Sequence, residues 1–116
     1  MVLCIVEDLI FSIKIQTAAK SLGVDIYFER NGDMVLPRIR EKQPALVIFD
    51  LNATRLKPME AIAGMKADRD LAAIKTLGFV SHVDVDTIAE ARRAGVDQVL
   101  ARSAFATRLG DILTGA

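Results

Sequence analysis

The stretch that decides the fold is PALVIFDLN, residues 44–52, an apolar run that ends on the carboxylate of Asp50. A short run of branched apolar side chains, opened by Pro44, is typical of a strand buried on both faces of a parallel sheet. In open α/β sheets the carboxyl ends of the strands frame the crevice in which ligands bind. Asp50, at the end of this expected strand, is therefore a candidate for chemistry.

Length, charge and composition limit the class of protein that the sequence can encode. The length of 116 residues predicts one domain, residues 1–116. Lysine plus arginine and aspartate plus glutamate balance at 15 each, so the charge does not indicate a nucleic-acid-binding surface. No apolar run approaches the roughly 20 residues that cross a bilayer, and no secretory signal is recognised, so no membrane partner is expected. With a single cysteine, Cys4, the sequence fits a reducing cytoplasm.

Strand-like and helix-like patterns alternate along the chain. The first expected strand, Val2–Val6, ends on the acid pair Glu7-Asp8, much as residues 44–52 end on acid. Further strands are expected within residues 24–28, 73–80 and 98–101. Helices are expected over residues 11–22, around 35–39, from 58 to at least 65, over 86–94 and over 103–113. Five strands alternating with five helices predict right-handed crossovers and a parallel sheet covered on both faces.

Several residues predict where the helices begin and end. Gly23 and Gly95 follow two helical patterns and are expected to end those helices, while Pro58 suits the first position of another. Ser103 is expected to cap a single final helix. The apolar residues predicted on one face of that helix are Phe105, Leu109, Ile112 and Leu113.

Taken with the acids at the strand ends, the chain resembles the receiver domain of bacterial response regulators over essentially its whole length. The resemblance rests on VED at residues 6–8, VIFDLN at residues 47–52 and AGVDQVL at residues 94–100. It implies a doubly wound, flavodoxin-like α/β fold, with a five-stranded parallel sheet of order 2-1-3-4-5 and five helices. It also implies a signalling protein of two-component phosphorelays and not an enzyme.

The resemblance assigns roles to the acids. Asp50 would be the phosphoacceptor, and Glu7, Asp8 and Asp50 would hold Mg²⁺ together with the backbone carbonyl of Asn52. Aspartate is a poor nucleophile toward a phosphoryl donor unless the charge on the transferring group is neutralised, and Mg²⁺ prefers oxygen ligands of this kind. The structural alternative for Asp8 is a cap on the first helix, a role compatible with metal binding.

The chain departs from the family pattern at two further functional positions, the lysine after the fifth strand and the switch hydroxyl after the fourth. The Lys-Pro pair that follows the fifth strand in receivers is Arg102-Ser103 here. Arg102 would contact phosphate in place of the lysine, with a longer side chain and a planar fork of donors. The switch hydroxyl falls on Val80 by direct counting, and only a shift of one residue brings Ser81 into that role.

Two functions therefore remain open: an atypical receiver that accepts phosphate on Asp50, and a phosphorylation-independent pseudo-receiver that binds other proteins. The implied partners are a histidine kinase, a phosphotransfer protein or another signalling protein. A homodimer is expected to use the face formed by residues 86–94, 98–101 and the final helix. A third reading is weaker: residues 50–54 resemble the nucleophile motif of haloacid-dehalogenase-type phosphatases, but Asn52 stands where those enzymes place a second aspartate.

The start of the first expected helix and the loop after the fourth expected strand each contain one further feature. Leu9, Ile10 and Phe11 are consecutive apolar residues that cannot all face the core from one helix, so one or two are expected to cover the cleft or to meet a partner. His82 is the only histidine and lacks companions for a metal site, so it is expected to be an ordinary loop residue.

Overall fold

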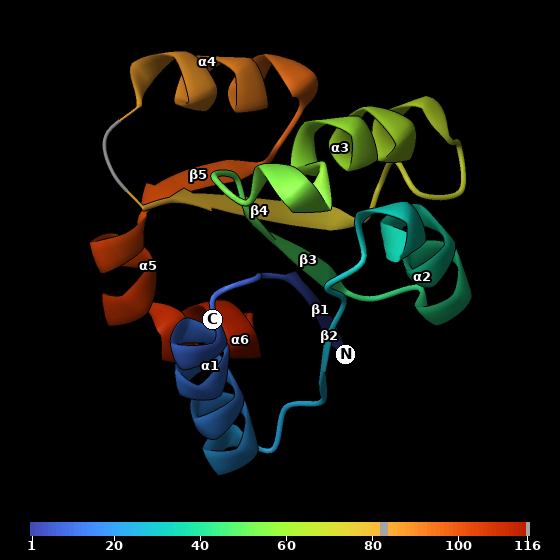
Figure 1. Ribbon diagram of the computed structural model, residues 1–116. Helices are drawn as coiled ribbons and strands as arrows, with labels where there is room; N and C mark the ends of the chain where they lie inside the picture. The colour runs from blue at the N-terminus through green and yellow to red at the C-terminus, as the bar shows by residue number, and fades with distance from the viewer. Residues whose placement is uncertain (82–83, 116) are drawn as a thin grey trace.

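The five strands form one parallel sheet of order β2-β1-β3-β4-β5 (Figure 1), and the predicted fold class is confirmed. The computed structural model describes residues 1–81 and 84–115, so His82 lies outside the described residues. The strands are β1 (Val2–Ile5), β2 (Ile26–Phe28), β3 (Leu46–Asp50), β4 (Lys75–Val80) and β5 (Gln98–Ala101).

The helices alternate with these strands. The α-helices are α1 (Leu9–Leu22), α2 (Val35–Lys42), α3 (Pro58–Ala67), α4 (Val85–Ala94), α5 (Arg102–Thr107) and α6 (Leu109–Thr114). Two 3-10 helices, η1 (Gly32–Met34) and η2 (Thr54–Leu56), precede α2 and α3. Over residues 1–81 and 84–115, none of the helices has both the length and the apolar composition of a membrane span.

The strand β3 lies at the centre of the sheet. It pairs with β1 on one side and with β4 on the other, and Ile48 is in register with Cys4 and with Leu77. The side chains of Val47, Ile48 and Phe49 are all buried, because helices cover both faces of a parallel sheet. The apolar run therefore has the position predicted for it, and it brings Asp50 to the carboxyl edge of the sheet.

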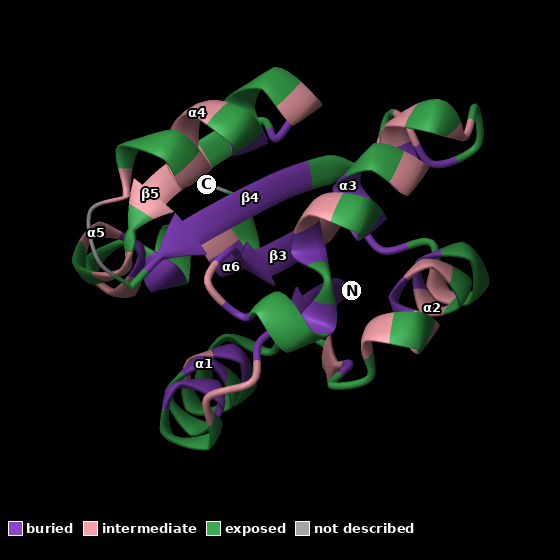
Figure 2. Ribbon diagram, turned by 45° about the horizontal axis from the view of Figure 1, so that its top comes forward, coloured by how far each residue is buried: buried purple, intermediate pink, exposed green. Residues whose placement is uncertain are grey.

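Helices α2, α3 and α4 cover one face of the sheet, and α1, α5 and α6 cover the other (Figures 1 and 2). Side chains alternate along each strand, so Leu3 and Ile5 of β1 pack in the first core while Val2 and Cys4 pack in the second. Burial raises the pKa of the Cys4 thiol well above its ordinary value, so this cysteine is inert packing.

Three aromatic rings join the helices of the second face to β4. Phe11 of α1 lies 5.2 Å from Phe79 and 5.7 Å from Phe105, measured between ring centroids. Phe79 and Phe105 stack at 4.8 Å. Such pairs contribute beyond the area they bury, because the ring quadrupoles favour offset and tilted contacts. The cluster therefore fixes the amino-terminal ends of α1 and α5 against the same part of the sheet.

The carboxyl-terminal segment corrects two predictions. The single final helix is divided into α5 and α6, because Arg108 leaves helical geometry at φ −98° and ψ 9°. The helix also begins at Arg102, with Ala101 as its N-cap, so the expected cap at Ser103 is wrong. The apolar pattern remained periodic across the break because α5 and α6 both bury residues against the same face. The stops at Gly23 and Gly95 are confirmed, each in a left-handed conformation.

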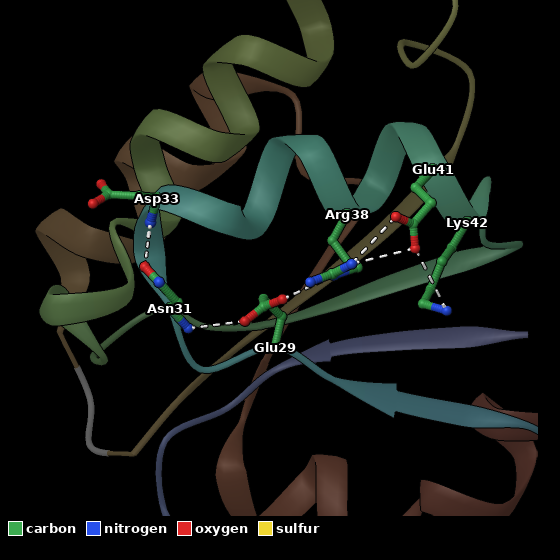
Figure 3. Close-up of polar contacts among 6 residues, drawn as sticks. All are labelled: Glu29, Asn31, Asp33, Arg38, Glu41 and Lys42. Atoms are coloured by element: carbon green, nitrogen blue, oxygen red, sulfur yellow. Dashed lines mark hydrogen bonds and ion pairs between the residues drawn. The ribbon is translucent and has the colours of Figure 1, made fainter.

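A polar network ties the edge strand β2 to α2 (Figure 3). The buried carboxylate of Glu29 accepts hydrogen bonds from Nε of Arg38 at 3.0 Å and from the backbone N–H of Asn31 at 3.1 Å. Arg38 also reaches Glu41 at 3.3 Å. Arg38 and Lys42 both lie over the ring of Tyr27, at 5.5 and 4.5 Å. These contacts hold the edge strand in place without any bound molecule.

Replacement of Phe105 by alanine tests the aromatic cluster. Phe105→Ala should lower the free energy of unfolding by about 3–5 kcal/mol, because it removes a buried ring and leaves a cavity between α5 and β4. Urea unfolding followed by circular dichroism measures the change. Phe28→Ala, which truncates a half-buried ring on the edge strand, is the control and should cost clearly less. Equal losses for the two variants would contradict a special role for the cluster.

Candidate functional site

The acids predicted to form a site lie at the carboxyl edge of the sheet. β1 and β3 are neighbours, with Ile5 in register with Phe49, so residues 7 and 8 leave β1 beside the end of β3. The negative charges of Asp8 and Glu7 raise the pKa of Asp50, and the positive charge of Arg102 lowers it. Four residues from three distant parts of the sequence therefore share one electrostatic environment.

Asp50 is the most enclosed member of the group, with 7% of its surface exposed. Burial is the largest influence on its pKa and raises it. The backbone N–H of Asn52 donates a hydrogen bond to Oδ1 of Asp50 at 3.1 Å and lowers the pKa in part. Asp50 is therefore a carboxylate whose charge is costly where it stands, a property common in functional sites.

Asp8 and Arg102 form an ion pair across the rim. Nη2 of Arg102 donates to Oδ2 of Asp8 at 2.9 Å, and the guanidinium lies 4.1 Å from the centroid of the Phe11 ring. Oδ1 of Asp8 accepts from the backbone N–H of Phe11 at 3.1 Å, so Asp8 also caps α1. The hydrogen bond from Arg102 is the largest cause that lowers the pKa of Asp8, followed by the one from Phe11. Both oxygens of Asp8 thus have partners within the chain.

Glu7 also has a cationic partner, and the sequence reasoning missed it. Nη1 of Arg55 lies 2.8 Å from Oε1 of Glu7, and the Arg55 side chain is 83% exposed. Arg55 belongs to η2, in the loop after β3, 48 positions from Glu7. Neither spacing nor charge pattern could have joined two residues so far apart. The cap role considered for Asp8 is present, and Arg102, which was expected at this rim, contacts Asp8. The cation beside Glu7 is known only from the structure.

Asn52 links the end of β3 to the end of β4. Its side-chain Oδ1 accepts a hydrogen bond from the backbone N–H of Ser81 at 2.6 Å, while its own N–H binds Asp50. Ser81, the residue considered as a switch hydroxyl, lies exposed directly after β4. The side chain of Asn52 therefore bridges two loops of the rim, a contact that the expected role of its carbonyl did not suggest.

The predicted ligand set does not fit Mg²⁺ as these side chains lie. Within residues 1–81 and 84–115, no three His, Cys, Asp or Glu side chains are grouped closely enough to hold a metal ion. Asp8 is held by Arg102 and by the α1 backbone, and Glu7 by Arg55. A divalent cation needs several free oxygens around one point. Here two of the three carboxylates are instead paired with guanidinium groups.

No protein-family model and no curated protein sequence matches the chain. Solved structures match it closely by shape. A response regulator from Hahella chejuensis superposes with a TM-score of 0.87 at 17% identity, covering 97% of this chain and 91% of that one. The phosphorylated cyanobacterial phytochrome response regulator RcpA gives 0.76 at 24% identity, covering 98% and 89%. The receiver domain of a sensor histidine kinase from Pseudomonas aeruginosa PAO1, with magnesium in its active-site cleft, gives 0.81 at 14% identity, covering 99% and 97%.

The order of the strands and the polar groups at the carboxyl edge of the sheet define the class of protein. A parallel sheet of order 2-1-3-4-5 with polar groups at the carboxyl ends of β1 and β3 is a flavodoxin-like α/β protein with its crevice at the switch point. Within that class, the chain has the fold of response regulator receiver domains over nearly its full length.

Removal of the Arg102 guanidinium should raise the pKa of Asp8 toward its ordinary value. The lowered pKa means that the ion pair stabilises the fold fully above the ordinary aspartate pKa of about 3.9 and stops doing so as the pH falls through the folded value. Arg102→Ala should therefore be destabilised at neutral pH, with a smaller loss of stability in acid. NMR titration of the carboxyl carbon measures the pKa, and Arg40→Ala, which disrupts an exposed ion pair with Asp68, should leave the pKa of Asp8 unchanged.

Replacement of Asp50 should raise the stability of the fold at neutral pH, whereas replacement of Arg102 should lower it. Its raised pKa means that ionised Asp50 destabilises the folded state at neutral pH, and that this cost disappears below about pH 3.9. Asp50→Asn keeps the acceptor for the Asn52 N–H, so it should unfold at higher denaturant than the parent at pH 7 and equally in acid. Asp33→Asn is the control, because Lys57 lowers the pKa of Asp33, and it should lose stability at pH 7. If Asp50→Asn were less stable than the parent at pH 7, the conclusion that the buried charge of Asp50 costs stability would be wrong.

Proposed function

We propose that this chain is an atypical receiver domain of two-component-type signalling that acts by binding other proteins, without phosphorylation of Asp50. The contact that carries the proposal is the ion pair between Arg102 and Asp8, with Nη2 and Oδ2 at 2.9 Å. Asp8 is the residue that would hold Mg²⁺ if the resemblance to phosphorylated receivers extended to their chemistry. Here that carboxylate already neutralises a cation supplied by the chain.

Displacing Arg102 from Asp8 would cost more than one contact. The guanidinium stacks on Phe11, whose ring belongs to the aromatic cluster, and Phe11 donates its backbone N–H to the same carboxylate. A hydrogen-bonded ion pair with a stacked guanidinium is held in one geometry, unlike an exposed lysine pair. A metal ion would therefore have to compete with an ordered cation for Asp8.

A second function, phosphate acceptance, is supported by the position of Asp50 at the end of the central strand. In that function Asp50 is the phosphoacceptor, Arg102 contacts the phosphoryl group, and Ser81 supplies the switch hydroxyl. Glu7, Asp8, Asp50 and the carbonyl of Asn52 would hold the Mg²⁺. These side chains would have to leave the arrangement described above, in which Arg102 and Arg55 bind two of the acids.

In either function the chain is a signalling module of the cytoplasm and not an enzyme, with residues 1–116 as one receiver-like domain. Its partners are a histidine kinase, a phosphotransfer protein or another signalling protein. A homodimer through α4, β5 and the segment formed by α5 and α6 is a further proposal. The exposed residues at both ends of β5 leave its edge accessible to such a contact.

Acetyl phosphate with Mg²⁺, followed by intact mass measurement, separates the two functions. We expect no added phosphoryl group on the parent chain, because Asp8 is paired with Arg102. Arg102→Ala should bind Mn²⁺ more tightly than the parent by several-fold, since it frees one oxygen of Asp8, and paramagnetic broadening of the amides near Asp8 reports the binding. Arg40→Ala should bind Mn²⁺ like the parent.

Two outcomes would overturn the proposal. One is a phosphoryl mass gain on the parent chain that disappears in Asp50→Asn, which would establish phosphate acceptance. The other is Mn²⁺ affinity of the parent equal to that of Arg102→Ala, which would mean that the ion pair does not protect Asp8.

A further inference from the structure

The edge strand β2 leaves one side of its backbone without partners. The C=O of Asp25 accepts a hydrogen bond from β1, and the N–H of Glu29 donates one to the C=O of Cys4. Because the backbone groups of successive residues in a strand alternate in direction, the N–H and C=O groups of Ile26 and Phe28 point away from the sheet. In the part of the chain that the structure describes, they have no hydrogen-bond partner. The edge therefore offers free donors and acceptors to an added strand.

The residues of this edge favour strand pairing. Residues 24–28, VDIYF, are branched or aromatic apart from one acid, and such side chains are enriched in strands. Natural edges are commonly protected by proline, by lysine within the strand, by a bulge or by shortness. β2 is short, but residues 24–28 contain neither proline nor lysine, and Ile26 to Phe28 pair with β1 without a bulge. Its three side chains are half-buried, so apolar surface accompanies the free backbone groups.

Cations lie beside this edge on both faces of the sheet. Lys42 leaves α2 on the side of the strand (Figure 3), and its Nζ lies 4.5 Å from the centroid of the Tyr27 ring. On the opposite face, the guanidinium of Arg30 lies 5.1 Å from the centroid of the Phe28 ring. Among the described residues, Arg30 has no carboxylate partner, and Lys42 has only Glu41, at 3.9 Å. Two cations are therefore weakly compensated by the chain itself.

Charge favours a strand of another protein over a second copy of this chain. The antiparallel register that pairs the whole of β2 with β2 of another copy sets Asp25 opposite Glu29 twice. Like charges directly opposite each other destabilise a strand pair. A foreign strand with carboxylates would instead complement Arg30 and Lys42. Addition of a strand to an open sheet edge is a common mode of peptide recognition, in which main-chain bonds supply affinity and alternate side chains supply specificity.

We infer that the open edge of β2 binds an acidic extended segment of another protein as an added antiparallel strand. The backbone groups of Ile26 and Phe28 hold the segment, and Arg30 and Lys42 select its charge. Antiparallel pairing is the commoner arrangement of neighbouring strands. The inference rests on the proposed role as an interaction module, and it assigns that role a surface and a partner of stated chemistry.

Fluorescence anisotropy with two labelled peptides of about eight residues, within the usual length of a strand, tests the inference. The acidic peptide alternates valine with glutamate, and the basic peptide alternates valine with lysine. The acidic peptide should bind, and the basic peptide should bind about tenfold more weakly or not at all. Affinity for the acidic peptide should fall several-fold in about 1 M salt, where the Debye length is about 3 Å.

N-methylated acidic peptides test whether backbone groups form the contact. With the valine side chains on the face of Ile26 and Phe28, the valine N–H groups of an antiparallel partner face β2 and the glutamate N–H groups face solvent. Methylation of the valine nitrogens should therefore abolish binding, and methylation of the glutamate nitrogens should leave it unchanged. Hydrogen exchange gives a second measurement, because the N–H groups of Ile26 and Phe28 should become protected when the peptide binds.

Substitutions locate the contact. Ile26→Pro removes an outward donor without removing a bond to β1, so it should weaken the acidic peptide about tenfold. Ile26→Val retains the donor and a branched side chain, and as the matched control it should bind like the parent. Lys42→Glu should weaken the acidic peptide and strengthen the basic one. Lys75→Glu, an equal change of charge at the exposed start of β4, should do neither. Circular dichroism establishes that each variant is folded, and the methylated peptides test the parent chain without any substitution.

Four results would overturn the inference: no binding of the acidic peptide, equal binding of the acidic and basic peptides, equal binding of the two methylated peptides, and a bound peptide that leaves the N–H groups of Ile26 and Phe28 unprotected. Self-association of the parent that Ile26→Pro abolishes, seen by sedimentation, would also overturn it, because a second copy would then occupy the edge. The proposed function fails separately. A phosphoryl mass gain that disappears in Asp50→Asn would overturn that function and leave the strand contact standing.

Discussion

Burial of β3 on both faces is the constraint on which the rest of the structure depends. Because Val47, Ile48 and Phe49 are all enclosed, β3 must lie inside the sheet with helices above and below. That position makes β1 and β4 its neighbours and brings three loops to the same edge. The acids following β1 and ending β3 are then brought to the same edge of the sheet by the order of the strands. The site is thus a consequence of strand order.

Part of the negative charge at that edge is compensated by the chain itself. Asp8 and Glu7 each have a guanidinium partner, and Asp50 is left enclosed, with only the Asn52 N–H bound to its side chain among the hydrogen bonds described. Two of the three carboxylates are therefore paired with cations of the chain, while burial makes the charge of the third costly. The same edge begins α1, so the rim and the first turn of that helix belong to one continuous part of the molecule.

The sequence predicted the central strand because its apolar run and the glycine stops are local patterns with few alternatives, whereas the sheet order came from the resemblance to receiver domains. It failed at the carboxyl terminus, where Phe105, Leu109 and Leu113 stay periodic across the break at Arg108. A change in one residue's backbone angles leaves no trace in such a pattern. The sequence likewise predicted only part of the candidate site. Strand ends located Asp8 and Asp50, whereas the contact of Arg55 with Glu7 and the bridge from Asn52 to Ser81 depend on loop paths that no local pattern encodes.

The position of Arg102 between Asp8 and Phe11 has an evolutionary consequence. One side chain supplies the countercharge of a helix cap and also covers the edge of an aromatic cluster, so a change at position 102 would alter the surroundings of both Asp8 and Phe11. Relatives that carry arginine at position 102 should keep an aromatic ring at position 11, and those that carry lysine there should be free to vary it. Such paired variation would show that the two positions change together.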